Sequence, residues 1–256
     1  MQIRRTTSTK NTKENNHKIM LRSIQQLYGD KLGASDGEIG HVKDFYFDDK
    51  NWAICYVVVD AGSWLAGRQV LISPHSLGRL DQAEKILRVN LTRKQIEDSP
   101  SILTHKPVSR QYEEEYYRYY GWPCYWQGDG LWGMSGFPIA TLPTQPFPDK
   151  LPAAHRLHPG PTDAHLRSAQ AVNGYHIKAS DGTIGHVCDF MMDAQSWAIR
   201  QLVVKTGHRF SGKEVLVSTK NVDRISYEDS TVFVDLTSEA VEHGSGHYVA
   251  PVGAAV

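Results

Sequence analysis

Short apolar stretches separated by polar turns dominate two parts of the chain. In the first part, residues 42–47 and 52–59 are rich in β-branched and aromatic side chains, and the polar residues 48–51 separate them. This pattern predicts two β-strands joined by a turn. Residues 52–59 are apolar at nearly every position, so we expect their strand to be covered on both faces. The pair Asp36-Gly37, between two other apolar segments, predicts a tight hairpin.

The same pattern returns further along the chain without a gap. Residues 35–92 align with residues 180–237, so that SDGEIGHVKDF at 35–45 corresponds to SDGTIGHVCDF at 180–190. Such self-similarity predicts two copies of one folding unit, which we expect to fold as separate barrels, each around its own core. We place repeat 1 at residues 20–98 and repeat 2 at residues 167–243.

Each copy holds further strand signals and ends at a short helix. Thr92 begins this helix in repeat 1, and Gln95 completes a capping box with it. Six short strands in fewer than about 80 residues predict a small β-barrel, closed or partly open. The remaining strands are expected at 70–72, 77–80 and 86–91 in repeat 1, and at 215–217, 222–225 and 232–236 in repeat 2.

These segments resemble the PRC-barrel family. Its pattern is a "dG..iG.v.d" hairpin, matched by LGASDGEIGHVKD at 32–44, followed by an aromatic strand and a "vliP" or "vlis" strand, matched at 70–73 and 215–218. The resemblance implies an all-β protein with two small PRC-type β-barrels. In the reaction-centre H subunit and the ribosome-maturation factor RimM, this barrel binds other macromolecules. The resemblance therefore implies a binding role rather than a reaction.

A long aromatic- and proline-rich linker, residues 99–166, separates the repeats. Ser109 and Gly121 are suited to the start and end of a short helix at about 109–120. Its tyrosines recur at i, i+4 and i+7, which makes one aromatic stripe. Three interpretations remain open: the arm packs on its own barrels, docks a partner, or stacks on nucleic-acid bases, which residues 113–115, all Glu, disfavour. The candidate partner-binding residues are Tyr112, Tyr116, Tyr119, Trp122 and Trp126.

Three further segments lack the composition of a folded core. Residues 1–19 are basic and almost devoid of apolar side chains, and residues 138–161 are rich in proline. Residues 244–256 are predicted to form a flexible tail. We expect all three to be mobile and to be cut first by proteases. Met1 and Met20 are equally natural positions for the start of translation.

Charge and cysteine content favour an ordinary cytoplasmic protein. The 28 basic and 28 acidic side chains cancel, so no global field favours nucleic acid. The three cysteines lie far apart, which is typical of free thiols in a reducing compartment. No apolar run approaches the roughly 20 residues that span a bilayer. No secretory signal is recognisable, and we expect no membrane span.

No local motif indicates catalysis or a cofactor. Nucleophile elbows, phosphate loops, dinucleotide fingerprints and zinc-protease motifs are all missing from the sequence. His155, His158 and His165 with Asp163 are a conceivable metal-binding group. They lie in or near the proline-rich segment, whose ordering would cost binding energy. We therefore expect no metal, no cofactor and no catalytic residue.

Two residue pairs recur in both copies. His41 precedes Asp44 by three positions, as His186 precedes Asp189. On a strand this spacing places the side chains on opposite faces, so we interpret them as surface histidines and turn-stabilising aspartates. Trp52 and Trp197 also recur and begin the most apolar strand of each copy. We expect both indole rings to be buried core anchors.

The leading functional hypothesis is a non-catalytic, cytoplasmic, bacterial scaffold protein that binds a protein partner through tandem barrels. An RNA- or ribosome-associated accessory factor is the alternative that RimM suggests, although the balanced charge weighs against it. A photosynthetic-complex-like assembly subunit is a second alternative, suggested by the H subunit. An enzyme is the least supported class.

Overall fold

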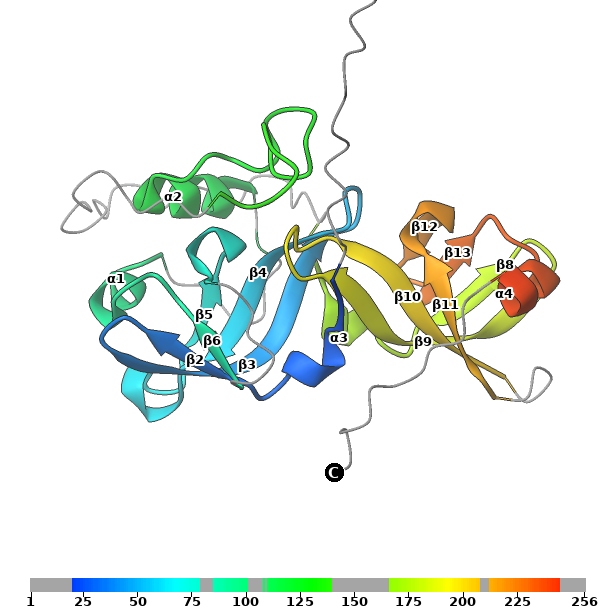
Figure 1. Ribbon diagram of the computed structural model, residues 1–256, viewed down its shortest axis with the longest axis horizontal. Helices are drawn as coiled ribbons and strands as arrows, with labels where there is room; N and C mark the ends of the chain where they lie inside the picture. Colours follow the sequence, from blue (N-terminus) through cyan, green and yellow to red (C-terminus); the bar gives the residue numbers. More distant parts are fainter. Residues whose placement is uncertain are drawn as a thin grey trace, which may run out of the picture.

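The computed structural model shows a mostly β protein with few helices (Figure 1). The predicted tails and residues 140–161 of the proline-rich segment lie outside the residues that it describes, as do the four candidate metal ligands. The described residues are 20–78, 85–100, 108, 110–139, 166–207 and 212–244.

Corresponding strands occur in the same order in the two repeats, and most of them have the same or nearly the same length. Repeat 1 contains β1 (Leu21–Ser23), β2 (Lys31–Ala34), β3 (Gly37–Asp48), β4 (Ala53–Asp60), β5 (Gln69–Ile72), β6 (Ile86–Arg88) and α1 (Arg93–Glu97). Repeat 2 contains β7 (Leu166–Ser168), α3 (Ala169–Val172), β8 (His176–Ala179), β9 (Gly182–Asp193), β10 (Ile199–Thr206), β11 (Glu214–Ser218), β12 (Val222–Ser226), β13 (Thr231–Val234) and α4 (Ser238–Gly244).

The sheets are not closed barrels, so of the two predicted forms, closed or partly open, the closed one is wrong. Repeat 1 has the order β5-β4-β3-β2-β6, and repeat 2 has the order β11-β10-β9-β8-β13-β12. In repeat 2 the outer strands β11 and β12 are consecutive in the chain, separated by a 3₁₀ turn at Thr219–Asn221. These two outer strands are not hydrogen-bonded to each other in the sheet. Closure of a barrel requires the outer strands to pair.

The predicted hairpin opens each repeat, and a glycine in it allows two strands to approach closely. Gly40 and Gly185 occupy equivalent positions in β3 and β9. A Cβ atom on Gly40 would lie 2.0 Å from the Asp60 carbonyl oxygen, and one on Gly185 would lie 2.1 Å from the Lys205 carbonyl oxygen. Backbone oxygens cannot move aside cheaply, which explains glycine at both positions.

We expect Gly185→Ala to lower the free energy of unfolding by about 2–3 kcal/mol, because the methyl group forces β9 away from β10. The matched control is Gly207→Ala, whose Cβ would meet its nearest neighbour at an ordinary 3.7 Å. Urea unfolding measures both variants. Equal, small losses in the two variants would contradict the proposed close approach.

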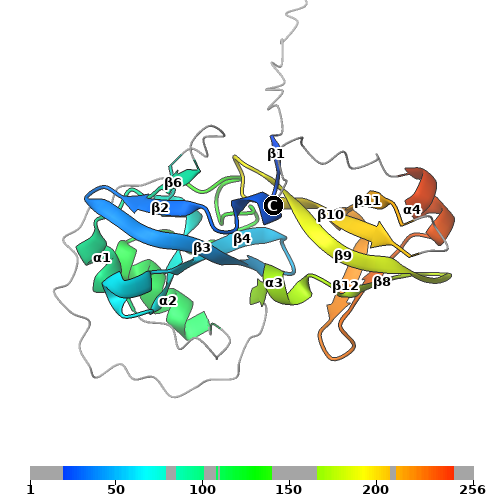
Figure 2. The ribbon, with the colours of Figure 1, turned by 90° about the horizontal axis from the view of Figure 1, so that it is seen from below.

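The repeats exchange their first strands. β1 of repeat 1 pairs antiparallel with β9 of repeat 2, and β7 of repeat 2 pairs antiparallel with β3 of repeat 1 (Figure 2). Both exchanged strands have the sequence Leu-Arg-Ser, at 21–23 and 166–168. The internal repeat thus extends further toward the N-terminus than the alignment of residues 35–92 indicated, and each sheet is completed by the other repeat.

The recurring aspartates hold these exchanged strands in place. Ser168 donates a hydrogen bond to the Asp44 carboxylate (2.5 Å), and the Gln170 backbone N–H donates another (3.1 Å). Asp189 accepts the equivalent bonds from Ser23 and from the Gln25 backbone. Burial raises the pKa of both carboxyls, and these hydrogen bonds oppose that shift.

The interpretation of these aspartates as turn stabilisers needs a correction, because the turns that they cap belong to the other repeat. Asp44 and Asp189 are buried at the contact between repeats, and each caps the corner that follows the other repeat's exchanged strand. His41 and His186 are exposed, as expected from the strand spacing. A β-bulge lies between Val42 and Asp44 and another between Val187 and Asp189, yet each histidine is exposed and each aspartate is buried.

A single hydrophobic core runs through both repeats. The rings of Phe47 and Phe190 meet across the contact at 5.7 Å between centroids. The turns before β4 and β10 also pair, because the Ile54 N–H donates to the Trp197 carbonyl and the Ile199 N–H donates to the Trp52 carbonyl. The buried residues of both copies form one cluster. The expectation of two separate cores is therefore wrong.

The two recurrent tryptophans differ in burial. Trp197 is only 3% exposed, whereas Trp52 is partly exposed and stacks on Phe47 at 5.5 Å. The core-anchor prediction is confirmed for Trp197 and needs correction for Trp52. No helix among residues 20–244, within the described segments, is long and apolar enough to span a membrane.

Candidate interaction grooves

The aromatic arm, defined here as residues 108–139, covers one face of repeat 1. It contains α2 (Arg110–Tyr120) and the loop that follows, drawn in green above β4 and β5 in Figure 1. The segment predicted to form a helix at about 109–120 is thus helical from residue 110. Its position explains why β4 is buried along nearly its whole length, as the sequence predicted.

Two tyrosines of α2 attach the arm to the end of β5. The Tyr116 hydroxyl donates to the Leu71 carbonyl (2.8 Å) and accepts from the Ser73 backbone N–H (3.3 Å). The Tyr117 and Ser73 hydroxyls lie 3.4 Å apart. These bonds satisfy backbone groups just beyond the strand, and both rings are fully buried.

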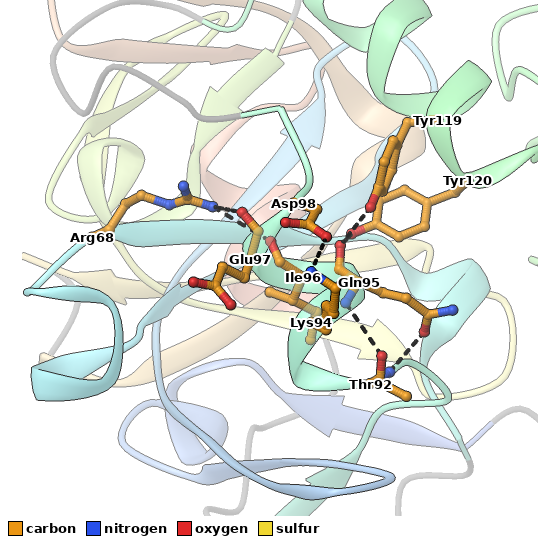
Figure 3. Close-up of polar contacts among 9 residues, drawn as sticks. All are labelled: Arg68, Thr92, Lys94, Gln95, Ile96, Glu97, Asp98, Tyr119 and Tyr120. Carbon is orange, nitrogen blue, oxygen red and sulfur yellow. Dashed lines mark hydrogen bonds and ion pairs between the residues drawn. The ribbon is translucent and has the colours of Figure 1, made fainter. Parts of the chain in front are cut away.

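Other tyrosines attach the arm to the end of repeat 1. The hydroxyls of Tyr119 and Tyr120 both point to the Gln95 carbonyl oxygen in α1, at 3.1 and 3.5 Å (Figure 3). The predicted capping box of Thr92 and Gln95 is confirmed at the start of that helix. Tyr112 donates to the Pro100 carbonyl (2.8 Å).

A buried carboxylate lies between the arm and β4. Glu113 is fully buried and accepts hydrogen bonds from the hydroxyls of Tyr125 (2.7 Å) and Tyr56 (3.2 Å). Burial raises the pKa of the neighbouring Cys55 thiol, and the Glu113 charge adds to that effect. Cys55 is therefore a protonated, enclosed thiol, unsuited to nucleophilic chemistry at neutral pH.

His75 is enclosed by the aromatic rings of the arm. It stacks on Trp122 (5.7 Å) and meets Trp132 edge-on (5.1 Å between centroids). Burial lowers its pKa, and its Nδ1 lies 3.0 Å from the Ile139 carbonyl, so Nδ1 carries the proton. Trp132 also donates to the Ser196 carbonyl (2.7 Å), which ties the arm to repeat 2.

The buried tyrosines predict alkaline unfolding. Burial raises the pKa of Tyr119 to about 12 and shifts the pKa values of Tyr112, Tyr116 and Tyr120 upward as well. A raised folded-state pKa contributes stability that is fully present below pH 10 and is lost as the pH rises, because unfolded tyrosines ionise first.

We therefore expect stability to fall between about pH 10 and 12. Absorbance at 295 nm should show that only part of the 12 tyrosines ionises before circular dichroism reports unfolding. Ionisation of all of them near pH 10 in a protein with an unchanged spectrum would contradict the burial of the arm.

Repeat 2 has an open groove where repeat 1 has the arm. We define the repeat 2 groove as a hollow of about 660 Å³ beside β10 and the 48–52 turn. Residues 197–204, like 52–59, have apolar residues on both faces, which predicts a strand covered on both sides. This prediction is wrong for β10, which is exposed at Arg200 and partly exposed at Gln201. The lining residues are Leu21, Lys50, Asn51, Trp52, Ala198, Ile199, Arg200, Gln201, Ser218, Thr219, Lys220 and Val222.

The alignment of the repeats shows that this groove has an occupied counterpart. Ser218 corresponds to Ser73, which binds Tyr116 and Tyr117 of the arm. Gln201 corresponds to Tyr56, which donates to Glu113, and Lys220 corresponds to His75, which packs on Trp122 and Trp132. The arm therefore fills on repeat 1 the groove that is open on repeat 2.

A second hollow, of about 590 Å³, lies on the other side of the 48–52 turn. Its lining includes Trp126, Asp129 and Leu131 of the arm with Asp48 and Lys50 of repeat 1. Lys50 and Asn51 line both hollows. The turn thus forms a ridge between the repeat 2 groove and the end of the arm.

The structure places the five candidate partner-binding residues in two groups. Tyr116, Tyr119 and Trp122 are buried against repeat 1. For these three residues the structure agrees with the first of the three interpretations, in which the arm packs on its own repeat. Tyr112 and Trp126 are partly exposed, and Trp126 lines the second hollow.

Sequence reasoning missed the cations of the repeat 2 groove, Lys50, Arg200 and Lys220. A signal was present, because all three positions differ between the aligned copies: they correspond to Gln195, Cys55 and His75.

The titratable groups under the arm are enclosed by rings and hydrogen-bonded to structural partners. Among curated proteins, none matches the chain. Residues 177–241 match the family model of the PRC-barrel domain. This segment runs from β8 into α4 and includes β10 and β11 of the repeat 2 groove, and the chain thus carries a PRC-barrel domain in its second repeat.

Proposed function

We propose that this chain is a non-catalytic interaction protein that receives a segment of a protein partner in the repeat 2 groove. The observation that supports this proposal is the difference between the two equivalent grooves. On repeat 1 the groove is filled by a polypeptide of the same chain, which supports a polypeptide as the ligand of the equivalent groove. On repeat 2 the same arrangement of strands leaves the groove open.

The lining of the groove also supports a polypeptide ligand. Trp52, Leu21 and Val222 supply apolar surface, and Asn51 and Gln201 supply groups that bind backbone amides. Mixed apolar and polar lining of this kind is common at protein interfaces. The carbonyl oxygen of the Gln201 side chain is enclosed and makes no hydrogen bond within the described residues. A donor from a bound segment would satisfy it.

Site-specific photocrosslinking tests this proposal. Leu21, an exposed apolar residue of the groove, is replaced by the photoreactive residue benzoylphenylalanine, and Glu228, an exposed residue outside the groove, is replaced in a matched control. After irradiation of cells that express the full chain, we expect the Leu21 position to form a discrete protein adduct that the control lacks. Identical adducts at both positions, no adduct at Leu21, or an adduct removed by ribonuclease would contradict the proposal.

A further inference from the structure

The two grooves have the same geometry but different charge. Arg200 of repeat 2 and Lys50 of repeat 1 line the open groove, whereas the residues aligned with them, Cys55 of repeat 1 and Gln195 of repeat 2, are neutral. Lys220 replaces His75, whose pKa is lowered by burial. Each of these three differences places a cation at the open groove, in a chain whose overall formal charge is zero.

Two of these cations are available to a ligand. Lys50 and Lys220 are exposed, and neither takes part in the ion pairs found within the described segments. Arg200 lies 3.9 Å from the Asp193 carboxylate, which offsets part of its charge. The groove therefore combines a net positive rim with a partly exposed indole ring at Trp52.

The occupied groove shows which side chains such a surface accepts. There, the tyrosines of the arm bind the strand end, and Glu113 receives the hydroxyl of Tyr56. We propose that the repeat 2 groove binds an acidic protein segment that carries an aromatic or apolar anchor, with its carboxylates beside Lys50 and Lys220. This inference rests on the proposed function and specifies the chemistry of the partner.

Fluorescence anisotropy on the full chain tests the charge preference. The probe is a labelled twelve-residue peptide of alternating Glu and Tyr, compared with a matched peptide in which every Glu is Gln. Exposed ion pairs each contribute modestly, so two or three together predict about tenfold tighter binding of the Glu peptide at low salt. The preference should shrink in 0.5 M salt, because salt screens surface charge.

Paired variants locate the effect. Lys50→Gln/Lys220→Gln should remove most of the preference for the Glu peptide. The control Lys205→Gln/Lys213→Gln changes two exposed lysines of repeat 2 that do not line the groove and should retain it. Equal binding of the two peptides, binding of neither, or an equal loss in the control would overturn the inference.

The outcomes separate this inference from the proposed function. A protein adduct at Leu21 without any preference for the Glu peptide would leave the docking groove in place and reject only its acidic ligand. The absence of that adduct would reject both. A labelled oligouridine that displaces the Glu peptide from the groove and loses its own affinity in the Lys50→Gln/Lys220→Gln variant would overturn both in favour of RNA.

Discussion

Trp197→Ala is expected to lower the free energy of unfolding by about 3–5 kcal/mol, the usual loss for truncating a fully buried aromatic ring. Trp52→Ala, at the equivalent position, is expected to cost only about 1–2 kcal/mol, because the ring of Trp52 borders the open groove and already contacts solvent. Chemical unfolding of the two single variants measures the difference. Losses of the same size would contradict the structural asymmetry of the two grooves.

The shared core also predicts how many unfolding transitions these variants show. Since buried residues of both repeats form one cluster, Trp197→Ala should shift a single unfolding transition of the whole chain. Two transitions, of which only the one for repeat 2 moves, would instead favour repeats that unfold independently. Tryptophan-independent probes such as far-ultraviolet circular dichroism keep this measurement free of the substitution itself.

Glu113→Ala is expected to destabilise the protein by about 3 kcal/mol. The substitution removes the carboxylate that accepts hydrogen bonds from the buried hydroxyls of Tyr56 and Tyr125, and the loss of such a buried acceptor is costly in a protein interior. Glu114→Ala, one residue further along the same helix and exposed, is the matched control and should change stability by less than about 0.5 kcal/mol.

Glu113→Gln separates the charge of Glu113 from its hydrogen bonds. The amide oxygen still accepts a hydrogen bond, so this variant should retain more stability than Glu113→Ala. If Glu113→Ala were as stable as the Glu114→Ala control, α2 would not be held to β4 through this carboxylate. Thermal unfolding at neutral pH suffices to compare the three variants.

Local features of the fold were predictable because they depend on neighbouring residues. Turn residues and β-branched runs located the hairpins and the long strands, and Thr92 with Gln95 located the start of α1. The family resemblance is confirmed for residues 177–241. Each of these signals lies within a short window, where spacing and residue type decide the backbone conformation.

Features that join distant segments were not predictable in the same way. The exchanged strands β1 and β7 are three residues long, too short for a pattern of alternation, and their partners lie more than a hundred residues away. Asp44 and Asp189 bind the serines of these exchanged strands, and no local pattern marks either aspartate as the partner of a distant segment. Open sheets likewise depend on how β11 bends into β12, which the apolar pattern does not encode.

The candidate site was predictable only in part. The aromatic stripe of the arm was visible in the spacing of its tyrosines, but that spacing fits an internal contact as well as an external one. Burial of Glu113 was hidden, because acidic residues near a helix start usually stay solvated. The repeat 2 groove became recognisable only when the contacts of repeat 1 were transferred to the corresponding residues of its copy.

The exchange of first strands gives the chain the symmetry of a dimer without the constraints of one. Two identical subunits would have to carry identical grooves, since every substitution would appear twice. Here Tyr56 and Gln201, or Cys55 and Arg200, differ at equivalent positions because one continuous chain encodes both. A symmetric assembly would bind two ligands in equivalent ways. The groove proposed on repeat 2 instead predicts one bound segment per chain.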